Sequence, residues 1–225
     1  EKSVKAFPNN ILMYEKIEGK YQGSSYSEIR KEVIRFGAGL MALGIEKGDR
    51  IAMVAEGRTD WLVAELGIFY AGAINVPISI KLDSDYDFIF RLKHSGCRMV
   101  IVSWTQEEKL EKVFDRIDCL EKIIYLDPIK QKAQHRVQFS EIKKLGDEFL
   151  SNQENKARFD AVWQNIQPGD IANISYTSGT TADPKGIMLT QKNYATNVIQ
   201  GNSLMKIDEN FKTLTILPWD HSFAH

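Results

Sequence analysis

The sequence predicts an α/β fold built from mostly parallel sheets that are flanked by helices. From residue 25 onward, segments with helical spacing of apolar residues alternate with short runs rich in valine and isoleucine. Parallel strands that are buried on both faces have this composition. The chain has 225 residues, 43% of them hydrophobic, which is enough to bury the core of one large domain or two small ones.

The first predicted helix begins at residues 25–28, which read Ser-Tyr-Ser-Glu and form a capping box. Apolar residues then recur at helical spacing from Ile29 to Leu43. Gly44 is well placed to end this helix, because glycine accepts the left-handed conformation that follows many helices. Gly48 and Asp49 turn the chain into a strand at residues 50–55.

Further elements continue the alternation up to residue 126. They are a helix at 59–71, a strand at 73–80, a helix at 84–93, a strand at 99–103, a helix at 106–117 and a strand at 122–126. The polar residues 151–158 are expected to be helical or irregular, and Pro168-Gly169-Asp170 restarts ordered structure. We therefore divide the chain into an N-terminal α/β subdomain, residues 1–167, and a second part, residues 168–225. The second part holds a hairpin and the incomplete start of another α/β subdomain.

The second part is predicted to begin with two strands, at residues 171–176 and 186–190, that are joined by a loop. A helix at 191–201 and a strand at 213–217, which Pro218 ends, should follow. Four hydroxyl groups, Gly179 and Lys185 lie within the loop residues 177–186. Hydroxyl and backbone N–H donors can surround phosphate oxygens, glycine lets the main chain approach closely, and lysine adds a positive charge.

This loop differs from a Walker A loop, because Lys185 follows a proline and precedes Gly186 instead of a serine or threonine that opens a helix. The alternative is an ordinary turn that binds nothing, and the full ten-residue pattern disfavours it. Residues 176–181 (Tyr-Thr-Ser-Gly-Thr-Thr) and 183–186 (Asp-Pro-Lys-Gly) resemble the phosphate-loop signature of the adenylate-forming enzymes. These are the acyl-CoA synthetases, luciferases and peptide-synthetase adenylation domains. Ala182 stands where the family usually has glycine; if this position needs a positive φ, alanine costs about 1–2 kcal/mol.

Weaker matches to the same family extend over most of the chain. Residues 25–29, 43–52 and 72–78 resemble its early helix start, a Gly-Asp-Arg turn and a Gly-Ala-x-x-x-Pro strand. Arg58 and Trp61, spaced Arg-x-x-Trp, favour the long-chain fatty acyl-CoA branch. The resemblance therefore implies the N-terminal portion of the adenylate-forming enzyme fold.

Residues 217–221, which read Leu-Pro-Trp-Asp-His, resemble a second motif of this family. The resemblance places His221, and with it Trp219, beside the acyl substrate and the adenylate. The alternatives are an imidazole hydrogen-bonded at a turn for His221 and simple core packing for Trp219. His221 and His225 lack a third metal ligand, and no Gly-x-Ser-x-Gly elbow surrounds Ser178, so a metal pair and a hydrolase triad are both disfavoured.

The reaction that the resemblance implies has two steps: a carboxylate attacks the α-phosphorus of ATP, and coenzyme A then takes the acyl group. Thr177 is assigned to Mg²⁺. The residues assigned to the β and γ phosphates are Ser178, Gly179, Thr180, Thr181 and Lys185. The family's adenine motif and catalytic lysine are absent from residues 1–225, so no catalytic residue is assigned.

We therefore expect the N-terminal part of a long-chain fatty acid–CoA ligase that is inactive alone, with ATP, Mg²⁺, coenzyme A and a fatty acid as its small-molecule partners. Another carboxylate-adenylating enzyme, such as an aryl-acid ligase or an amino-acid adenylation domain, remains an alternative. A non-catalytic binding module that kept the fold is a second alternative.

Net charge and cysteine content limit the kinds of partner and the cellular compartment that fit the chain. Lys and Arg number 29 against 30 Asp and Glu, so the formal charge of −1 gives no global attraction to nucleic acid. Cys97 and Cys119 have no metal-type or disulfide-rich spacing, which favours a reducing cytoplasm. Residues 66–80, the most apolar stretch, are too few to span a bilayer. Peripheral contact with the inner face of a membrane stays open.

Overall fold

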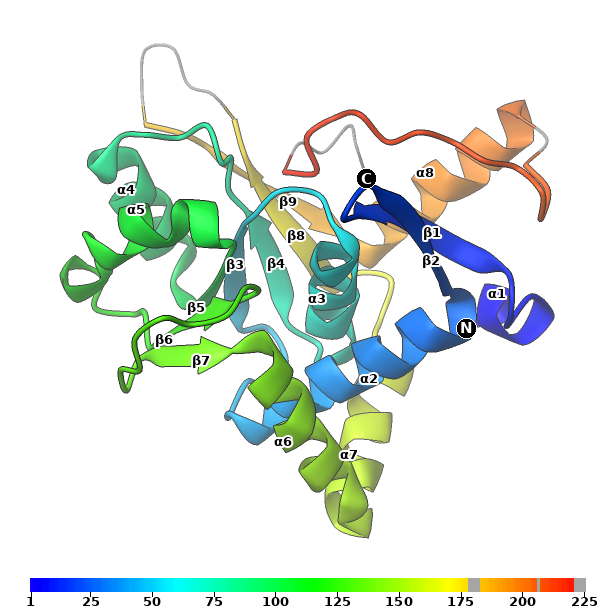
Figure 1. The fold of residues 1–225 in the computed structure, drawn as a ribbon, viewed down its shortest axis with the longest axis horizontal. Helices are drawn as coiled ribbons and strands as arrows, with labels where there is room; N and C mark the ends of the chain where they lie inside the picture. Colours follow the sequence, from blue (N-terminus) through cyan, green and yellow to red (C-terminus); the bar gives the residue numbers. More distant parts are fainter. Residues whose placement is uncertain (178–182, 206, 221–225) are drawn as a thin grey trace.

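A computed structural model of the protein describes residues 1–177, 183–205 and 207–220. These residues form a seven-stranded sheet with helices on both faces and a separate two-stranded hairpin (Figure 1). The strands are β1 (Ile11–Ile17), β2 (Lys20–Ser25), β3 (Arg50–Val54), β4 (Ile74–Pro77), β5 (Cys97–Val102), β6 (Lys122–Tyr125), β7 (Arg136–Gln138), β8 (Ile171–Tyr176) and β9 (Gly186–Thr190). The helices are α1 (Lys2–Ala6), α2 (Tyr26–Ala42), α3 (Thr59–Tyr70), α4 (Asp85–Ser95), α5 (Glu107–Glu111), α6 (Phe139–Ser151), α7 (Gln153–Gln164) and α8 (Gln191–Leu204).

The strand order across the large sheet is β7-β6-β5-β3-β4-β8-β9. Every neighbouring pair is parallel except β8 and β9, which are antiparallel. The predicted class, an α/β fold with a mostly parallel sheet between helices, is therefore confirmed. β8 pairs with β4, so residues on both sides of position 167 contribute to one sheet; the division of the chain at that position stays a prediction.

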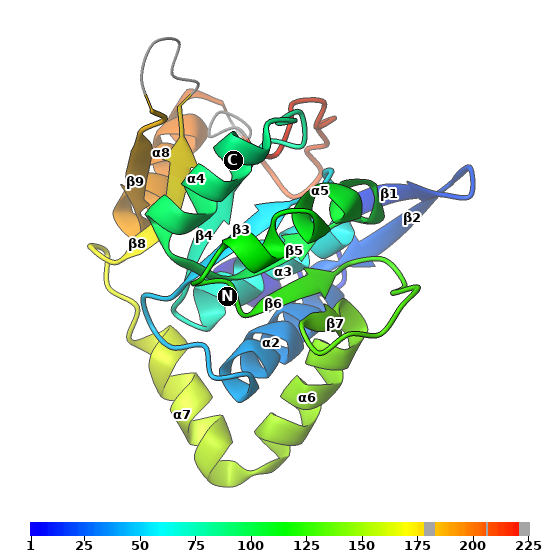
Figure 2. The same cartoon turned by 90° about the vertical axis from the view of Figure 1, so that its left-hand side faces the viewer.

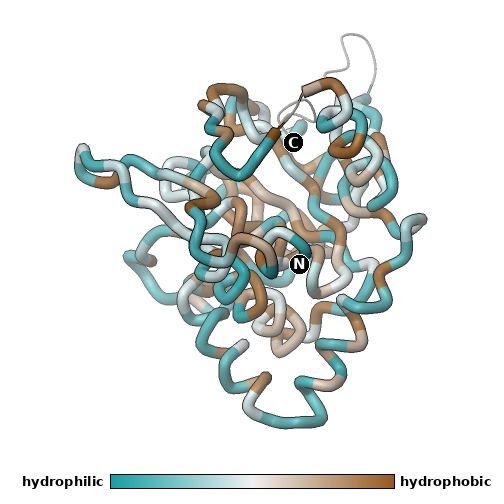
Figure 3. The backbone as a smooth tube through the Cα atoms, turned by 90° about the vertical axis from the view of Figure 1, so that its right-hand side faces the viewer, coloured by the Kyte–Doolittle hydropathy of each residue, from teal (hydrophilic) through white to brown (hydrophobic). Residues whose placement is uncertain are grey.

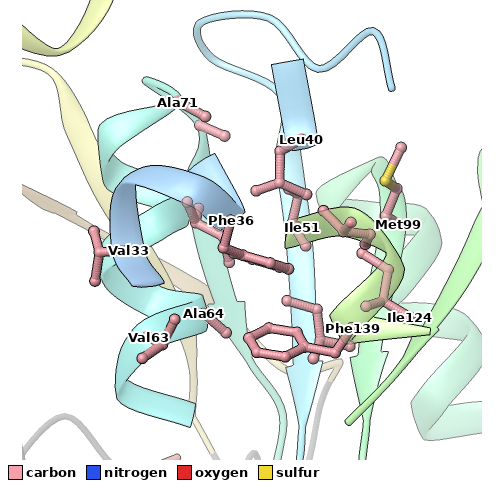
Figure 4. Packing of buried hydrophobic residues seen from close by; sticks show 14 of the residues in the cluster. Val33, Phe36, Leu40, Ile51, Val63, Ala64, Ala71, Met99, Ile124 and Phe139 are labelled. Carbon is pink, nitrogen blue, oxygen red and sulfur yellow. The ribbon is translucent and has the colours of Figure 1, made fainter. Parts of the chain in front are cut away.

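Two hydrophobic cores cover the two faces of this sheet, because successive side chains of a strand point to opposite sides. In β3, Ile51 and Met53 pack with α2, α3 and α6, whereas Ala52 and Val54 pack with α4 and α5. Figure 4 shows the first core, where the rings of Phe36 and Phe139 lie 4.4 Å apart at their centroids. Figure 2 shows α2 and α6 on one side of the sheet and α4 on the other.

The predicted first helix is confirmed together with its cap. The Ser25 hydroxyl accepts a hydrogen bond from the Glu28 backbone at 3.3 Å, and the Glu28 carboxylate accepts one from the Ser25 backbone at 2.8 Å. These two bonds satisfy N–H groups that have no partner inside the helix. Cys97 is fully buried, as the apolar run after it suggests, and burial raises the pKa of its thiol to about 12.

Several segments differ from the sequence prediction. Residues 106–117 are not one helix, because the short α5 lies between two 3-10 turns at Trp104–Gln106 and Phe114–Arg116. Residues 213–217 form no strand; Leu214 and Ile216 are 78% and 79% exposed, and these residues pair with no strand among the described residues. The β1–β2 hairpin and β7 were not predicted at all.

The polar stretch 151–158 forms the connection between α6 and α7 and the start of α7. The side chain of Asn152 caps α7 by accepting hydrogen bonds from the backbones of Glu154 and Asn155 at 2.9 and 3.1 Å. Figure 3 shows this end of the molecule, at the bottom of the view, as largely hydrophilic. Among the described residues, no helix combines the length and the apolar character that crossing a membrane requires.

Candidate functional site

The two stems of the predicted phosphate loop lie side by side in the β8–β9 hairpin. The backbone N–H of Thr177 donates to the carbonyl oxygen of Lys185 at 3.1 Å, and both residues are exposed. The structure therefore brings together two residues of the predicted site that are eight positions apart in the sequence. The other predicted loop residues, Ser178, Gly179, Thr180 and Thr181, lie outside the described residues, as do Ala182 and His221.

The hairpin places Thr177 at the carboxyl edge of the parallel sheet. β8 runs parallel to β4, and β4 runs parallel to β3, so the three strands end at the same edge. From that edge α3 leaves β3 on one face of the sheet, whereas α4 leaves β4 on the other face. Open α/β sheets bind ligands where successive connections diverge in this way.

Trp219 lies at the same edge, on the face of the sheet that α2 and α3 cover. Its indole lies against Gly57, which follows β3, and packs edge-on against Trp61 of α3 with ring centroids 5.2 Å apart. A Cβ on Gly57 would be only 2.9 Å from the indole nitrogen, so this contact requires glycine. Tyr176, at the end of β8, instead packs against the α4–α5 core. The loop stems and Trp219 thus approach the edge from different sides of the sheet.

Trp219 also lines a cavity of about 960 Å³ between the β1–β2 hairpin and residues 209–215. Tyr14, Leu62, Phe211 and Leu214 contribute apolar side chains to its wall. The hairpin is tied to α3 beside this cavity, because the Glu15 carboxylate accepts a hydrogen bond from the backbone of Thr59 at 2.9 Å. Trp219 therefore packs on the core and also lines a cavity; its place beside the acyl substrate stays a prediction.

Charged side chains fix the chain between β3 and α3. Glu56 accepts a hydrogen bond from the Thr105 hydroxyl at 2.5 Å, and Arg58 pairs with Asp127 at 2.8 Å. Burial opposes ionisation of Glu56, but hydrogen bonds from Ser103 and Thr105 outweigh it and lower the pKa of this carboxyl. Arg58 and the buried Trp61 therefore contact other parts of the fold, and these contacts fix the chain beside Gly57.

Sequence reasoning missed two contacts from α4 to the loop stems. Tyr86 donates a hydrogen bond to Asp183, and His94 shares one with Tyr176. The available signal was the spacing of aromatic residues on α4, since Tyr86, Phe90 and His94 are four positions apart and face one side of a helix.

The part of the chain that the structure describes has no cluster of three or more histidine, cysteine, aspartate or glutamate side chains able to hold a metal ion. A cation at this edge would need oxygens from elsewhere. The exposed hydroxyl of Thr177 is one hard oxygen donor of the kind that Mg²⁺ prefers.

Comparisons with known proteins agree with the resemblance seen in the sequence. The family model described as AMP-binding enzyme matches residues 1–225. Long chain acyl-CoA synthetase 8 of Arabidopsis thaliana is 30% identical over 93% of this chain and 29% of its own length. A long-chain-fatty-acid–CoA ligase of Macaca fascicularis is 29% identical over 79% of this chain and 24% of its own length. The chain therefore spans about a third or less of these curated relatives.

Solved structures show the same fold at lower identity. A long-chain-fatty-acid-CoA ligase from Archaeoglobus fulgidus aligns with a TM-score of 0.80 and 20% identity over 99% of this chain and 42% of that one. O-succinylbenzoate CoA synthetase from Bacillus subtilis, in complex with its acyl-adenylate intermediate, aligns with a TM-score of 0.68 and 21% identity over 98% of this chain and 49% of that one. At these identities the likeness establishes the fold alone, that of the N-terminal portion of adenylate-forming enzymes.

Proposed function

Because the chain belongs to the AMP-binding enzyme family, we propose that it supplies the ATP phosphate loop and one wall of the acid pocket of a long-chain fatty acid–CoA ligase. The observation that supports this most is the β8–β9 hairpin, which places Thr177 and Lys185 beside each other, exposed, at the carboxyl edge of the sheet. The chain covers about a third of its relatives, so the activity belongs to a protein that also contains the remaining parts.

The loop is suited to the triphosphate of ATP by its donors. Ser178, Gly179, Thr180 and Thr181 are proposed to donate hydrogen bonds to the β and γ phosphates, and Lys185 to supply the counter-charge. A hydrogen bond to a charged group contributes roughly 1.5–3 kcal/mol, so several together can hold a polyphosphate.

Mg²⁺ is proposed to enter with the nucleotide. The described residues hold no group of three or more potential metal ligands, and nucleotide-bound Mg²⁺ needs only one or two protein oxygens beside phosphate and water oxygens. Thr177 fits that requirement. When bound, the ion neutralises negative charge on the phosphates.

The proposed reaction proceeds in two balanced steps. A carboxylate oxygen of the fatty acid attacks the α-phosphorus, the bond to the β-phosphate oxygen breaks, and acyl-AMP and pyrophosphate form. The sulfur of coenzyme A, after losing its proton, then attacks the acyl carbon, and AMP leaves. Within this chain, the loop serves the first step by holding the phosphates that carry the growing negative charge.

The choice of a long-chain fatty acid is supported by the relatives and by the cavity. The relative that is 30% identical is named as a long chain acyl-CoA synthetase. The cavity beside Trp219 has apolar side chains in its wall, among them Leu62, Phe211 and Leu214, which an alkyl chain could contact. We also propose a cytoplasmic location, because Cys97 and Cys119 are both unpaired thiols, as is usual in a reducing compartment.

The experiment that tests this function is ATP–pyrophosphate exchange by the protein that joins this chain to the further parts found in its relatives. With a panel of carboxylic acids, the largest exchange is expected with long-chain fatty acids. Maximal exchange with an aryl acid or an amino acid would replace the fatty-acid assignment by the corresponding alternative. Lys185→Ala is expected to lower exchange by well over an order of magnitude, about 1.4 kcal/mol for each factor of ten.

Lys192→Ala is the matched control, since Lys192 is an exposed lysine at the start of α8 and has no proposed role. This control is expected to retain normal exchange. Equal exchange in Lys185→Ala and in the unchanged protein would refute the role of the loop.

A further inference from the structure

Three aromatic side chains form a stacked stripe along α4. The rings of Tyr86 and Phe90 lie 6.2 Å apart at an interplanar angle of 26°, and those of Phe90 and His94 lie 5.3 Å apart at 11°. Each ring thus limits the orientation of the next. α4 lies on the face of the sheet opposite to α2 and α6, near the end of β8 and the start of β9 (Figures 1 and 2).

Each end of the stripe holds one stem of the β8–β9 loop. The Tyr86 hydroxyl donates to a carboxylate oxygen of Asp183 at 3.0 Å, just before β9. His94 Nδ1 and the hydroxyl of Tyr176, the last residue of β8, share a hydrogen bond of 2.8 Å. The Arg91 guanidinium lies 5.8 Å from the centre of the Tyr176 ring and adds a cation–π contact.

We propose that α4 is a clamp that holds both stems of the loop, with His94 positioning Tyr176 and Tyr86 positioning Asp183, and that this clamp strengthens the binding of the ATP triphosphate. The inference rests on the proposed function. Tyr86 and His94 are positioning residues, since they contact the stems and not the nucleotide.

Two physical effects support the clamp. Fixing both ends of a loop before a ligand arrives lowers the conformational entropy that binding removes. In addition, Asp183 is a negative charge next to a loop that is meant for a highly anionic ligand. Its bond to Tyr86 keeps the carboxylate turned to α4, where it repels the phosphates less.

The Tyr86 hydroxyl is expected to contribute little to folding, which allows its role to be isolated. Tyr86 is 63% exposed, whereas Phe88 and Leu92 of the same helix are buried in the core at 1% and 0% exposure. The core residues therefore anchor α4, and loss of the Tyr86 hydroxyl is expected to leave the thermal midpoint unchanged.

The test uses Tyr86→Phe, which keeps the ring and its stacking but removes the hydroxyl. Two quantities are measured in the 225-residue chain: the Kd for Mg²⁺·ATP and the hydrogen-exchange rate of the Thr177 amide, whose bond to Lys185 closes the stem. The Kd is expected to rise by about three- to tenfold. This is less than the loss of a buried hydrogen bond to a charged group would cause, because the Tyr86–Asp183 bond is exposed. The exchange rate of the Thr177 amide is expected to increase. Tyr26→Phe, at the start of α2, removes a tyrosine hydroxyl on the other helical layer and is the matched control.

A double-mutant cycle shows whether Tyr86 acts through Asp183. In an Asp183→Ala background, Tyr86→Phe is expected to have no further effect on either quantity. Independent losses that simply add, or values for Tyr86→Phe that equal those of Tyr26→Phe, would overturn the clamp. If the unchanged chain binds no Mg²⁺·ATP, the nucleotide part of this inference fails. The proposed function is decided separately, by pyrophosphate exchange in the longer protein, and the Thr177 exchange rate still decides whether α4 holds the stems.

Discussion

At the scale of single residues, Gly146 shows how a missing side chain sets the distance between two helices. A Cβ at this position of α6 would lie 1.8 Å from the carbonyl oxygen of Arg35 in α2. Gly39 of α2 has the reciprocal contact, since its Cβ would lie 2.0 Å from the carbonyl oxygen of Ile142. The backbones of α2 and α6 therefore touch, and neither glycine can gain a methyl group without moving a helix.

Gly146→Ala is predicted to lower the free energy of unfolding by about 1–3 kcal/mol or more, because close-packed backbones cannot make room for the methyl group. The measurement is urea denaturation at constant temperature. Gly201→Ala in α8 is the matched control, since nothing lies within 4 Å of its Cβ position. That change is predicted to be neutral or to stabilise by up to about 1 kcal/mol through helix propensity. Equal effects of the two substitutions would show that α2 and α6 do not pack as described.

The sequence could predict which residues of the loop have side chains suited to bind phosphate. Hydroxyl, glycine and lysine content identified the loop without any structure. The positions that hold the loop could not be found in this way, because Tyr86 and Asp183 are 97 positions apart, and His94 and Tyr176 are 82 apart. The spacing of the aromatic residues on α4 marks one face of that helix, but which residues this face contacts depends on the packing of the whole sheet.

At the scale of elements, ion pairs reinforce the contact between α2 and α6. The Arg35 guanidinium binds both carboxylate oxygens of Asp147, one of them at 2.8 Å, and Lys143 pairs with Glu32 at 2.8 Å. The hydrogen bond from Arg35 lowers the pKa of Asp147 below its ordinary value of 3.8. A carboxyl with a lowered pKa stabilises the folded state when ionised, and it loses this effect when it takes up a proton.

Asp147→Asn is therefore predicted to destabilise the chain above pH 3.8 and to lose that effect as the pH falls through the folded-state pKa. The size should be only about 0.2–1 kcal/mol, because the Asp147 side chain is half exposed to water. Urea unfolding of both proteins between pH 2.5 and 7 measures the difference. A difference that grows as the solution is acidified would have the wrong sign and would exclude this ion pair as its source.

Element prediction succeeded where the pattern was regular and failed where tertiary contacts decide. α2 follows from its capping box and helical spacing, α3 and α4 were predicted from the alternation of segments, and the inner strands follow from their valine and isoleucine content. Residues 106–117 keep their buried positions Leu110, Val113 and Ile117 although the helix is interrupted. Residues 213–217 have the composition of a strand, but a strand also needs a neighbour with which to pair.

At the scale of the whole molecule, the order of the strands creates the candidate site. β3 and β4 end together while their helices leave on opposite faces, and β8 joins them with its loop at the same edge. The sequence predicted parallel strands between helices but not this order, because register and neighbours are set by long-range packing. The order explains why Thr177, Lys185 and Trp219 all reach one edge of the sheet.

The central claim, that the β8–β9 loop holds the triphosphate of ATP, is tested most directly by paramagnetic relaxation in the 225-residue chain. Mn²⁺ replaces Mg²⁺ with ATP, and the broadening of each backbone amide resonance is measured. The amides of Thr177 and Lys185 are predicted to broaden first, and excess inorganic tripolyphosphate in its magnesium form should reverse the effect. Broadening centred on another part of the chain, or none at millimolar nucleotide, would contradict the claim.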